Sequence, residues 1–276
     1  MGHVSHVTVG RWACAVLGAV MLSASARAAA PIDPAQMMPI AEIRQYKITA
    51  GNRDRFIQLF DREFVETQEA VGMKMVGQFR DLDDPNRFVW IRAFKDMPSR
   101  AEALTSFYAG PVWQAHRNEA NPLLDDNDNV LFLHEAAAQS GFAPDTRPRP
   151  TAGAAPTHAG LVVATIYYLW KAPEEGFASF FEDRMKPALH DSGIDVLADF
   201  VPESTPNNFP KLPVRQGEKL FVWFARFDDA EAYAKARTRL EASAAWHDGV
   251  GAALADRLER TPQILRLEPT ARSQLR

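Results

Sequence analysis

An internal repeat restricts this chain to folds that are built from two similar units. The segment FVWIRAF at residues 88–94 reappears as FVWFARF at residues 221–227, at an offset of 133 residues. Trp113 reappears as Trp246 at the same offset. We therefore expect two copies of one domain.

A second match shows where the copies differ in length. Residues 60–62 (FDR) correspond to residues 181–184 (FEDR) at an offset near 121. The second copy therefore carries about twelve additional residues between the two matches, visible as segment 207–217 (NNFPKLPVRQG). A chain of 276 residues has room for two domains of roughly 100 residues each.

The hydrophobic pattern predicts the same element order in both copies, strand–helix–strand–strand–helix–strand. In the first copy the sequence Ser99-Arg-Ala-Glu102 matches a capping box and predicts a helix start at Ser99. The predicted strands are 40–48, 73–80, 87–94, 130–134, 161–170, 194–201, 220–227 and 263–267, and the predicted helices are 52–70, 99–107, 112–121, 174–189 and 229–255.

This order is the split β-α-β-β-α-β arrangement of ferredoxin-like domains, an α+β class in which helices cover one face of an antiparallel sheet. Alternation in Phe88, Trp90, Arg92 and Phe94 places large residues on one face, and we expect such a face to need a partner. We therefore predict that the two sheets pack face to face as a single-chain dimeric α/β barrel.

Composition shifts give the domain boundaries. We predict a first domain at 38–136, a Pro/Ala-rich linker at 137–159 and a second, divergent domain at 160–270. Residues 1–28 have the order of a signal peptide, with one early arginine, an apolar stretch at 13–22 and Ala26-Arg27-Ala28 before the cleavage site. The alternatives are an uncleaved anchor, for which the apolar stretch is short, and a mitochondrial transit peptide, which is typically rich in arginine.

These features predict an exported protein, periplasmic or secreted. Cys14 is the only cysteine and lies in the signal peptide, so the mature chain has no thiol nucleophile, disulfide or thiolate metal ligand. The net charge of −4 and the absence of a basic run argue against nucleic acid as a partner.

Three segments of the first copy resemble the NIPSNAP family. They are residues 42–46 (EIRQY), the hairpin from 77–80 (GQFR) into 88–92 (FVWIR), and 107–113 (FYAGPVW) leading to His116. The resemblance implies the dimeric α/β-barrel fold, which the family shares with antibiotic-biosynthesis-type monooxygenases and haem-handling relatives, and it implies no settled enzymatic activity. The second copy lacks Tyr-Ala-Gly-Pro, and there Trp246 is followed directly by His247.

Two residues are candidates for catalysis. His116 follows Trp113 by three residues on one helical face, and a histidine can exchange a proton near neutral pH. Tyr46, on a predicted strand, is the second candidate. The alternative for the His116 group, which includes Arg117, is a packing tryptophan beside a surface histidine.

Aromatic residues on predicted strands are candidates for binding an apolar ligand. On predicted strands these are Tyr46, Phe79, Trp90 and Arg92 in the first copy and Tyr167, Trp223 and Arg226 in the second. Trp113, on a predicted helix, is a further candidate. Core packing explains them equally well, and a buried Arg92 would need a carboxylate partner. The available partners are Glu42, Glu63 and Asp81.

Motifs for cofactors and metals are not found, so we predict neither. Segment 125–129 (DDNDN) has alternating oxygen ligands like a calcium loop but lacks the glycine and the final glutamate, and it is interpreted as a solvated turn. His116 and His158 are the histidines considered as haem ligands, but no haem-attachment motif exists in the sequence.

Two functions remain open at this point. The first is a protein that binds a small apolar molecule or a partner protein, and the second is a cofactor-independent oxygenase in which His116 or Tyr46 assists deprotonation of an electron-rich aromatic substrate. The fused halves are expected to be a monomeric pseudo-dimer or to form a homodimer.

Overall fold

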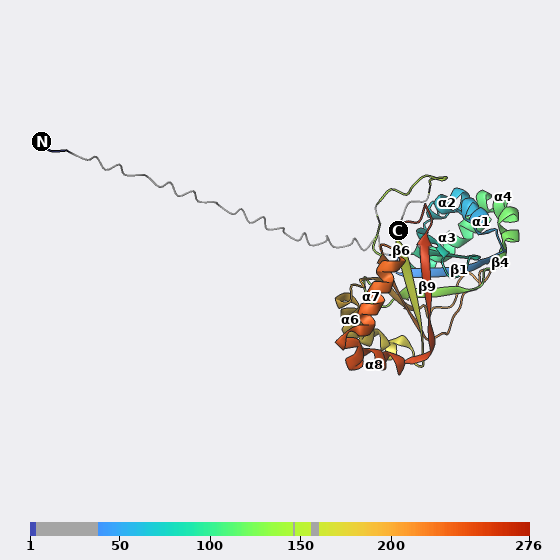
Figure 1. Ribbon diagram of the computed structural model, residues 1–276. Helices are drawn as coiled ribbons and strands as arrows, with labels where there is room; N and C mark the ends of the chain where they lie inside the picture. The colour runs from blue at the N-terminus through green and yellow to red at the C-terminus, as the bar shows by residue number, and fades with distance from the viewer. Residues whose placement is uncertain (4–37, 146, 156–159) are drawn as a thin grey trace. The chain divides into compact units, whose positions relative to one another are not determined.

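An antiparallel sheet that closes on itself as a barrel is the centre of the fold (Figure 1). The computed structural model describes residues 1–3, 38–145, 147–155 and 160–276. The predicted signal peptide, apart from its first three residues, lies outside the described residues, as does its cleavage site after Ala28. No helix in the described ranges has the length and apolar character that a membrane span requires.

The strands follow the predicted segments closely. They are β1 (Ile40–Ile48), β2 (Lys74–Asp81), β3 (Arg87–Phe94), β4 (Leu124–Asp126), β5 (Val130–Glu135), β6 (Leu161–Leu169), β7 (Val196–Pro202), β8 (Leu220–Phe227) and β9 (Leu258–Pro269). Their order is β3-β2-β9-β6-β8-β7-β5-β1, and pairing of β1 with β3 closes the ring. This barrel confirms the predicted α+β class.

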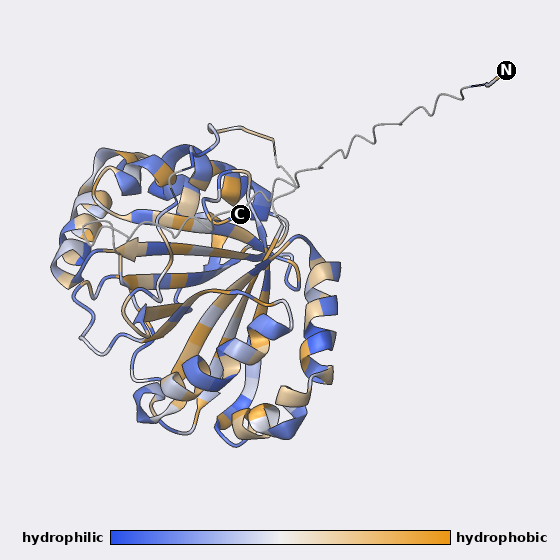
Figure 2. Cartoon of the chain, turned by 90° about the vertical axis from the view of Figure 1, so that its left-hand side faces the viewer, coloured by the Kyte–Doolittle hydropathy of each residue, from blue (hydrophilic) through white to orange (hydrophobic). Residues whose placement is uncertain are grey.

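The helices lie outside the barrel, where Figure 2 shows hydrophilic residues among them while the strands are rich in hydrophobic ones. They are α1 (Arg53–Leu59), α2 (Val65–Glu69), α3 (Met97–Ala109), α4 (Pro111–Ala120), α5 (Phe177–Phe180), α6 (Lys186–Asp191), α7 (Ala230–Ala242) and α8 (Gly251–Ala255). A π-helical turn at Phe60–Phe64 joins α1 to α2, and another at Phe181–Met185 joins α5 to α6. The predicted helices 52–70 and 174–189 are therefore interrupted, and the predicted helical segment 229–255 is divided between α7 and α8.

One predicted helix start is wrong. Helix α3 begins at Met97 instead of Ser99, because Asp96 is its N-cap and accepts a hydrogen bond from the Ser99 backbone N–H at 2.8 Å. Helix α7 begins in the same way, with Asp229 accepting from the Ala232 N–H at 2.7 Å. Aspartate is as good an N-cap as serine, so the apparent capping box identified the right helix and the wrong cap.

The two faces of the strands that form the ring pack into different cores. Ile43, Ile91 and Val222 point into the barrel, where strands of both halves pack on one another. Trp90 and Phe88 point outward under α1–α4. We expected the large side chains of this strand to face the other copy, and this was wrong for Phe88, Trp90, Arg92 and Phe94. The narrow interior of a small barrel accepts mainly aliphatic side chains from β3, so the large side chains lie under the helices.

The two halves also meet edge to edge, which the sequence analysis did not predict. Strand β2 pairs with β9 and strand β5 pairs with β7, both antiparallel. These pairings satisfy backbone groups that a free sheet edge would leave unpaired. The barrel core is consequently shared between the halves.

The strand registers repeat along the chain. In the first half Ile40 pairs with Phe94, and in the second half Leu161 pairs with Phe227. These partners differ by the same offsets, 121 and 133, as the sequence matches. Positions in one half can therefore be compared directly with positions in the other.

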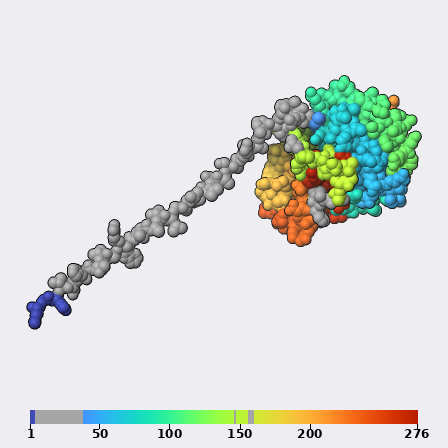
Figure 3. Space-filling view, turned by 90° about the horizontal axis from the view of Figure 1, so that it is seen from above, coloured from blue at the N-terminus to red at the C-terminus, as the bar shows by residue number. Residues whose placement is uncertain are grey.

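The C-terminal tail is an ordered part of the barrel wall. Beyond β9, Thr270 N–H donates to the Gln78 carbonyl and Leu275 N–H donates to the Val76 carbonyl, both at 2.8 Å. The described part of the predicted linker lies on this face next to the first half (Figure 3). From it, Arg149 donates to the Arg272 carbonyl at 2.6 Å. The domain boundaries themselves stay predictions.

Buried Asp61 beside this tail gives a pH-dependent prediction. Burial raises the pKa of Asp61 from 3.8 to about 6, and Arg272 and Arg80 oppose this only in part. A raised carboxyl pKa means that the folded state keeps its proton, so this contribution to stability is present below pH 3.8 and is lost as the pH rises through 6. We expect Asp61→Asn to raise the free energy of unfolding by about 1–3 kcal/mol at pH 7.5. Urea unfolding at pH 7.5 and 3.5 checks this, because an equal gain at both values would contradict it.

Candidate functional site

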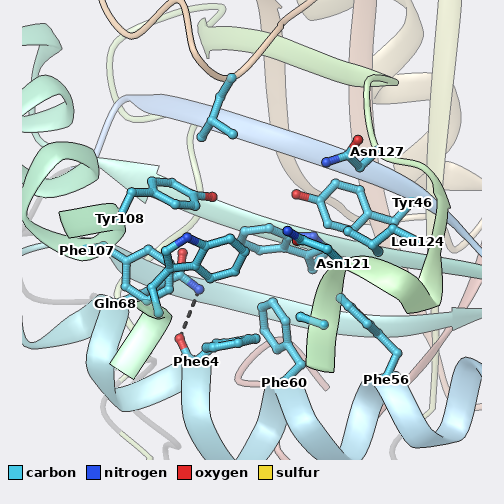
Figure 4. A pocket seen from close by; sticks show the side chains of 14 residues that line it. Tyr46, Phe56, Phe60, Phe64, Gln68, Phe107, Tyr108, Asn121, Leu124 and Asn127 are labelled. Atoms are coloured by element: carbon cyan, nitrogen blue, oxygen red, sulfur yellow. Dashed lines mark hydrogen bonds between the residues drawn. The ribbon is translucent and has the colours of Figure 1, made fainter. Parts of the chain in front are cut away.

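A cavity of about 80 Å³ lies between the outer sheet face of the first half and its helices (Figure 4). Its lining is mainly aromatic, with a few amide and hydroxyl groups. The lining residues are Tyr46, Phe56, Phe60, Phe64, Gln68, Trp90, Phe107, Tyr108, Trp113, Ala120, Asn121, Leu124, Asn127 and Leu212. Such a lining suits a small planar molecule.

The local sequence pattern brings the aromatic rings together. Phe56, Phe60 and Phe64 recur every four residues and so share one face of the helical segment from α1 to the π-helical turn. Opposite them, Tyr46 on β1 and Trp90 on β3 pack edge to face with ring centroids 5.6 Å apart. Phe60 meets Trp90 at 4.9 Å, so the helix and the sheet form opposite walls.

Two tyrosine hydroxyl groups face each other across the cavity, those of Tyr46 and Tyr108 (Figure 4). The Tyr46 oxygen accepts a hydrogen bond from Arg44 Nε at 2.8 Å. Because this bond uses an acceptor site of the oxygen, the hydroxyl proton of Tyr46 remains able to donate to a bound molecule. Burial raises the pKa of Tyr46 although Arg44 opposes the shift, so the phenol stays protonated at neutral pH.

A fully buried charge cluster lies next to the sheet wall of the cavity. Glu42, Arg44, Arg92 and Arg100 all have 0% exposure. The Glu42 carboxylate accepts hydrogen bonds from Arg44 Nη1 at 2.7 Å, Arg92 Nη2 at 2.7 Å and Arg100 Nε at 2.8 Å. Burial opposes ionisation of Glu42, but the attraction of Arg92, Arg44 and Arg100 outweighs it and holds the pKa of Glu42 well below its ordinary value.

Three guanidinium groups against one carboxylate leave a surplus of two positive charges in this cluster. The remaining hydrogen-bond partners are neutral, including Gln68 Oε1, which accepts from Arg92 Nη1 at 3.0 Å. Arg44 Nη2 is buried without a hydrogen-bond partner among the described residues. Uncompensated buried charge destabilises a fold, so its presence beside a cavity indicates a site for a negative group.

The second half keeps the aromatic residues and lacks the charges. At the positions of Tyr46 and Trp90 it has Tyr167 and Trp223, both buried. The charged positions carry other residues, which are Val163 for Glu42, Thr165 for Arg44, Ala225 for Arg92 and Tyr233 for Arg100. Only the first half therefore has the cationic cluster.

The residues proposed from the sequence fall into four places. Tyr46, Trp90 and Trp113 line the cavity, and Arg92 lies in the cluster beside it, paired with Glu42. Trp223 lies in the core of the second half, 6.0 Å from Phe181 between ring centroids. His116 is outside the lining, with its Nε2 atom 3.4 Å from Glu63 Oε2.

The remaining candidates from the sequence lie elsewhere. His158 falls outside the described residues. The DDNDN segment includes the end of β4, and Asp125 pairs with Lys47 at 2.6 Å. The described ranges contain no group of three or more His, Cys, Asp or Glu side chains that is arranged for a metal ion.

Sequence reasoning missed Arg44, Arg100 and Tyr108 as site residues. Arg44 was recoverable, because it lies between Glu42 and Tyr46 in strand alternation and so shares their face. Tyr108 lies within a segment already noted for its resemblance. Arg100 gives no signal in the sequence, since only helix–sheet packing brings it to Glu42.

Solved structures place the barrel in a known fold class. A proposed monooxygenase from Fusobacterium nucleatum superposes with a TM-score of 0.55 at 11% identity, covering 85% of this chain and 94% of that chain. An anthrone oxidase-like protein superposes with a TM-score of 0.52 at 10% identity, covering 87% and 94%. At these identities the likeness shows the fold alone, that of dimeric α/β-barrel monooxygenase-like proteins.

The family assignment comes from the first half. Residues 41–136 match the NIPSNAP family model, so the chain contains a NIPSNAP domain. A NIPSNAP domain protein from Burkholderia xenovorans matches with 29% identity and a TM-score of 0.34, covering 38% of this chain and 99% of that chain. A search among curated proteins found no match.

Proposed function

We propose that the NIPSNAP domain of this chain binds a small aromatic molecule through an acidic oxygen, taken up as the anion. The observation that carries this proposal is the surplus of two buried positive charges beside the aromatic cavity. The rings of Trp90 and Phe60 supply apolar contact to a planar molecule, and the Tyr46 hydroxyl supplies a hydrogen bond.

The charge cluster favours binding of the oxygen in its anionic form. A negative oxygen at the Tyr46 hydroxyl would lie one hydrogen bond away from Arg44, whose guanidinium donates to that same hydroxyl. In a buried site, charge attraction is much stronger than in water. The anion therefore gains more from the site than the neutral acid does, and the pKa of a bound phenol falls.

A pair of matched probes tests the proposal with the chain from Ala29 to Arg276. We expect 4-nitrophenol to bind and nitrobenzene, which lacks the acidic oxygen, to bind at least about 10-fold more weakly, since a hydrogen bond to a charged group contributes about 1.5–3 kcal/mol. Titration calorimetry at pH 8 measures both affinities.

The colour of the nitrophenolate anion allows a second measurement, the pKa of the bound probe. We expect the pKa of bound 4-nitrophenol to fall by about 1 relative to the free probe. Binding of neither probe would refute the site. Equal binding of both probes without a colour shift would leave an apolar cavity and refute the anion preference.

A second candidate function is oxidation of such a molecule without a cofactor. It is favoured by the placement of Tyr46 and Arg44, which would stabilise the electron-rich anion that reacts with dioxygen. In the conversion of anthrone to anthraquinone, one dioxygen is consumed, the methylene carbon becomes a carbonyl and one water forms. Oxygen uptake with anthrone in proportion to enzyme would support this candidate, and its absence would leave the binding function alone. His116 has no part in this scheme, because it lies outside the cavity lining.

We also propose that the chain arose by internal duplication and that it is exported. The repeated offsets of sequence and strand register support an internal duplication of a ferredoxin-like unit, after which only the first copy carries the charge cluster. The order of residues 1–28 supports export to the periplasm or exterior, and N-terminal sequencing of the mature protein would locate the cleavage.

A further inference from the structure

The additional segment of the second half lies over the cavity of the first half. It connects β7 to β8, yet its apolar residues pack on the aromatic core of the NIPSNAP domain. Leu212 lines the cavity, and Phe209 stacks on Tyr108 with ring centroids 5.8 Å apart. The cavity wall of one half is thus completed by the other half.

Polar contacts tie the same segment to the charge cluster. Arg100 Nη1 donates to Asn207 Oδ1 at 3.0 Å and to Asn208 Oδ1 at 2.6 Å. Asn208 Nδ2 in turn donates to the Met97 carbonyl at 2.6 Å, and Asn207 Nδ2 donates to the Leu212 carbonyl at 2.9 Å. Besides Glu42, the partners of Arg100 in this segment are both neutral amides, so they accept its hydrogen bonds without reducing the surplus charge.

We propose that residues 207–212, the covering segment, determine which molecules the NIPSNAP domain accepts. Leu212 and Phe209 limit the size of the bound molecule, and Asn207 and Asn208 hold Arg100 in place while preserving the positive charge of the cluster. This inference rests on the proposed binding function. It assigns the divergent second half a role in the specificity of the first.

The size limit is tested by shortening Leu212. We expect Leu212→Ala to raise the affinity for 4-nitro-1-naphthol relative to 4-nitrophenol by about 10-fold, because a few methylene groups in an apolar pocket change selectivity by this order. Lys211→Ala, on the exposed side of the same segment, is the matched control and should leave the ratio unchanged. Leu212→Val serves as the smaller change if the alanine variant fails to fold.

The charge effect is tested by replacing one amide with a carboxylate. We expect Asn208→Asp to weaken binding of 4-nitrophenolate by about 10-fold, since the new charge neutralises part of the surplus, and to leave nitrobenzene binding unchanged. Ser204→Asp adds the same charge at an exposed position of the connection and should have little effect.

The outcomes separate this inference from the proposed function. In one outcome, the unaltered protein binds 4-nitrophenol while Leu212→Ala and Asn208→Asp keep the same ratios of affinity between the probes. In that case the covering segment has no role in specificity, and this inference fails while the proposed function stands. If the unaltered protein binds no probe, the proposed function fails first. Circular dichroism of each variant establishes that any lost binding is not lost folding.

Discussion

Glu42→Gln should lower the free energy of unfolding by about 3–5 kcal/mol, because it leaves buried guanidinium groups without their carboxylate. Glu42 accepts hydrogen bonds from Arg44, Arg92 and Arg100, and all four side chains are fully buried. A neutral amide replaces the attraction to three cations with dipolar contacts only. Urea unfolding at pH 7 measures the loss.

The control for this prediction is Glu102→Gln on the exposed face of α3, which should change stability by less than about 0.5 kcal/mol. A loss for Glu42→Gln no larger than for the control would mean that the cluster is not held by its carboxylate.

Transplanting the residues of the second half separates stability from binding. The fourfold variant Glu42→Val, Arg44→Thr, Arg92→Ala and Arg100→Tyr removes all four charges of the cluster and should fold more stably than Glu42→Gln. It should also lose preference for 4-nitrophenolate over nitrobenzene. A fourfold variant that keeps this preference would show that the buried charges do not select the anion.

Tyr46→Phe should weaken binding of 4-nitrophenolate by about 10- to 100-fold, since a hydrogen bond to a charged group contributes about 1.5–3 kcal/mol. The substitution removes the hydroxyl that accepts from Arg44 Nε and leaves the ring that packs on Trp90. Nitrobenzene binding should be unchanged, because it depends on the rings alone. Titration calorimetry with both probes checks the difference.

Tyr167→Phe is the matched control, because Tyr167 occupies the equivalent strand position in the second half and is equally buried. It should leave both affinities as they are. Equal losses from Tyr46→Phe and Tyr167→Phe would place binding elsewhere than the first-half cavity.

Strands were predicted well because their signal is local. The bounds of β1 and β3 follow from alternation and turn residues, and the structure reproduces them. The start of α3 was misplaced because two side chains in the same stretch, Asp96 and Ser99, are both suitable caps, and geometry alone selects between them. The full length of β9 was missed because its start carries charged and polar residues, which join the strand by pairing with β6.

Part of the candidate site was also predictable. Trp90 and Trp113 were proposed as ligand-binding candidates and both line the cavity, and Glu42 was one of three carboxylates offered as partners for Arg92. The choice among these carboxylates depends on the register of β1 against β3, which places Glu42 directly opposite Arg92. His116 shows the limit of this reasoning. Its helical spacing from Trp113 predicted the helix face on which His116 lies, but not that its side chain pairs with Glu63.

The sequence by itself determined the repeat, the strand and helix order and the existence of about twelve additional residues in the second copy, because these depend on local pattern and on comparison within the chain. Only the tertiary structure decided that the additional residues cover the cavity of the first half and that three arginines surround Glu42. Arg100 lies 58 residues from Glu42, and Asn208 lies 108 residues from Arg100. Contacts across such separations are set by packing of helices and strands, which no local pattern encodes.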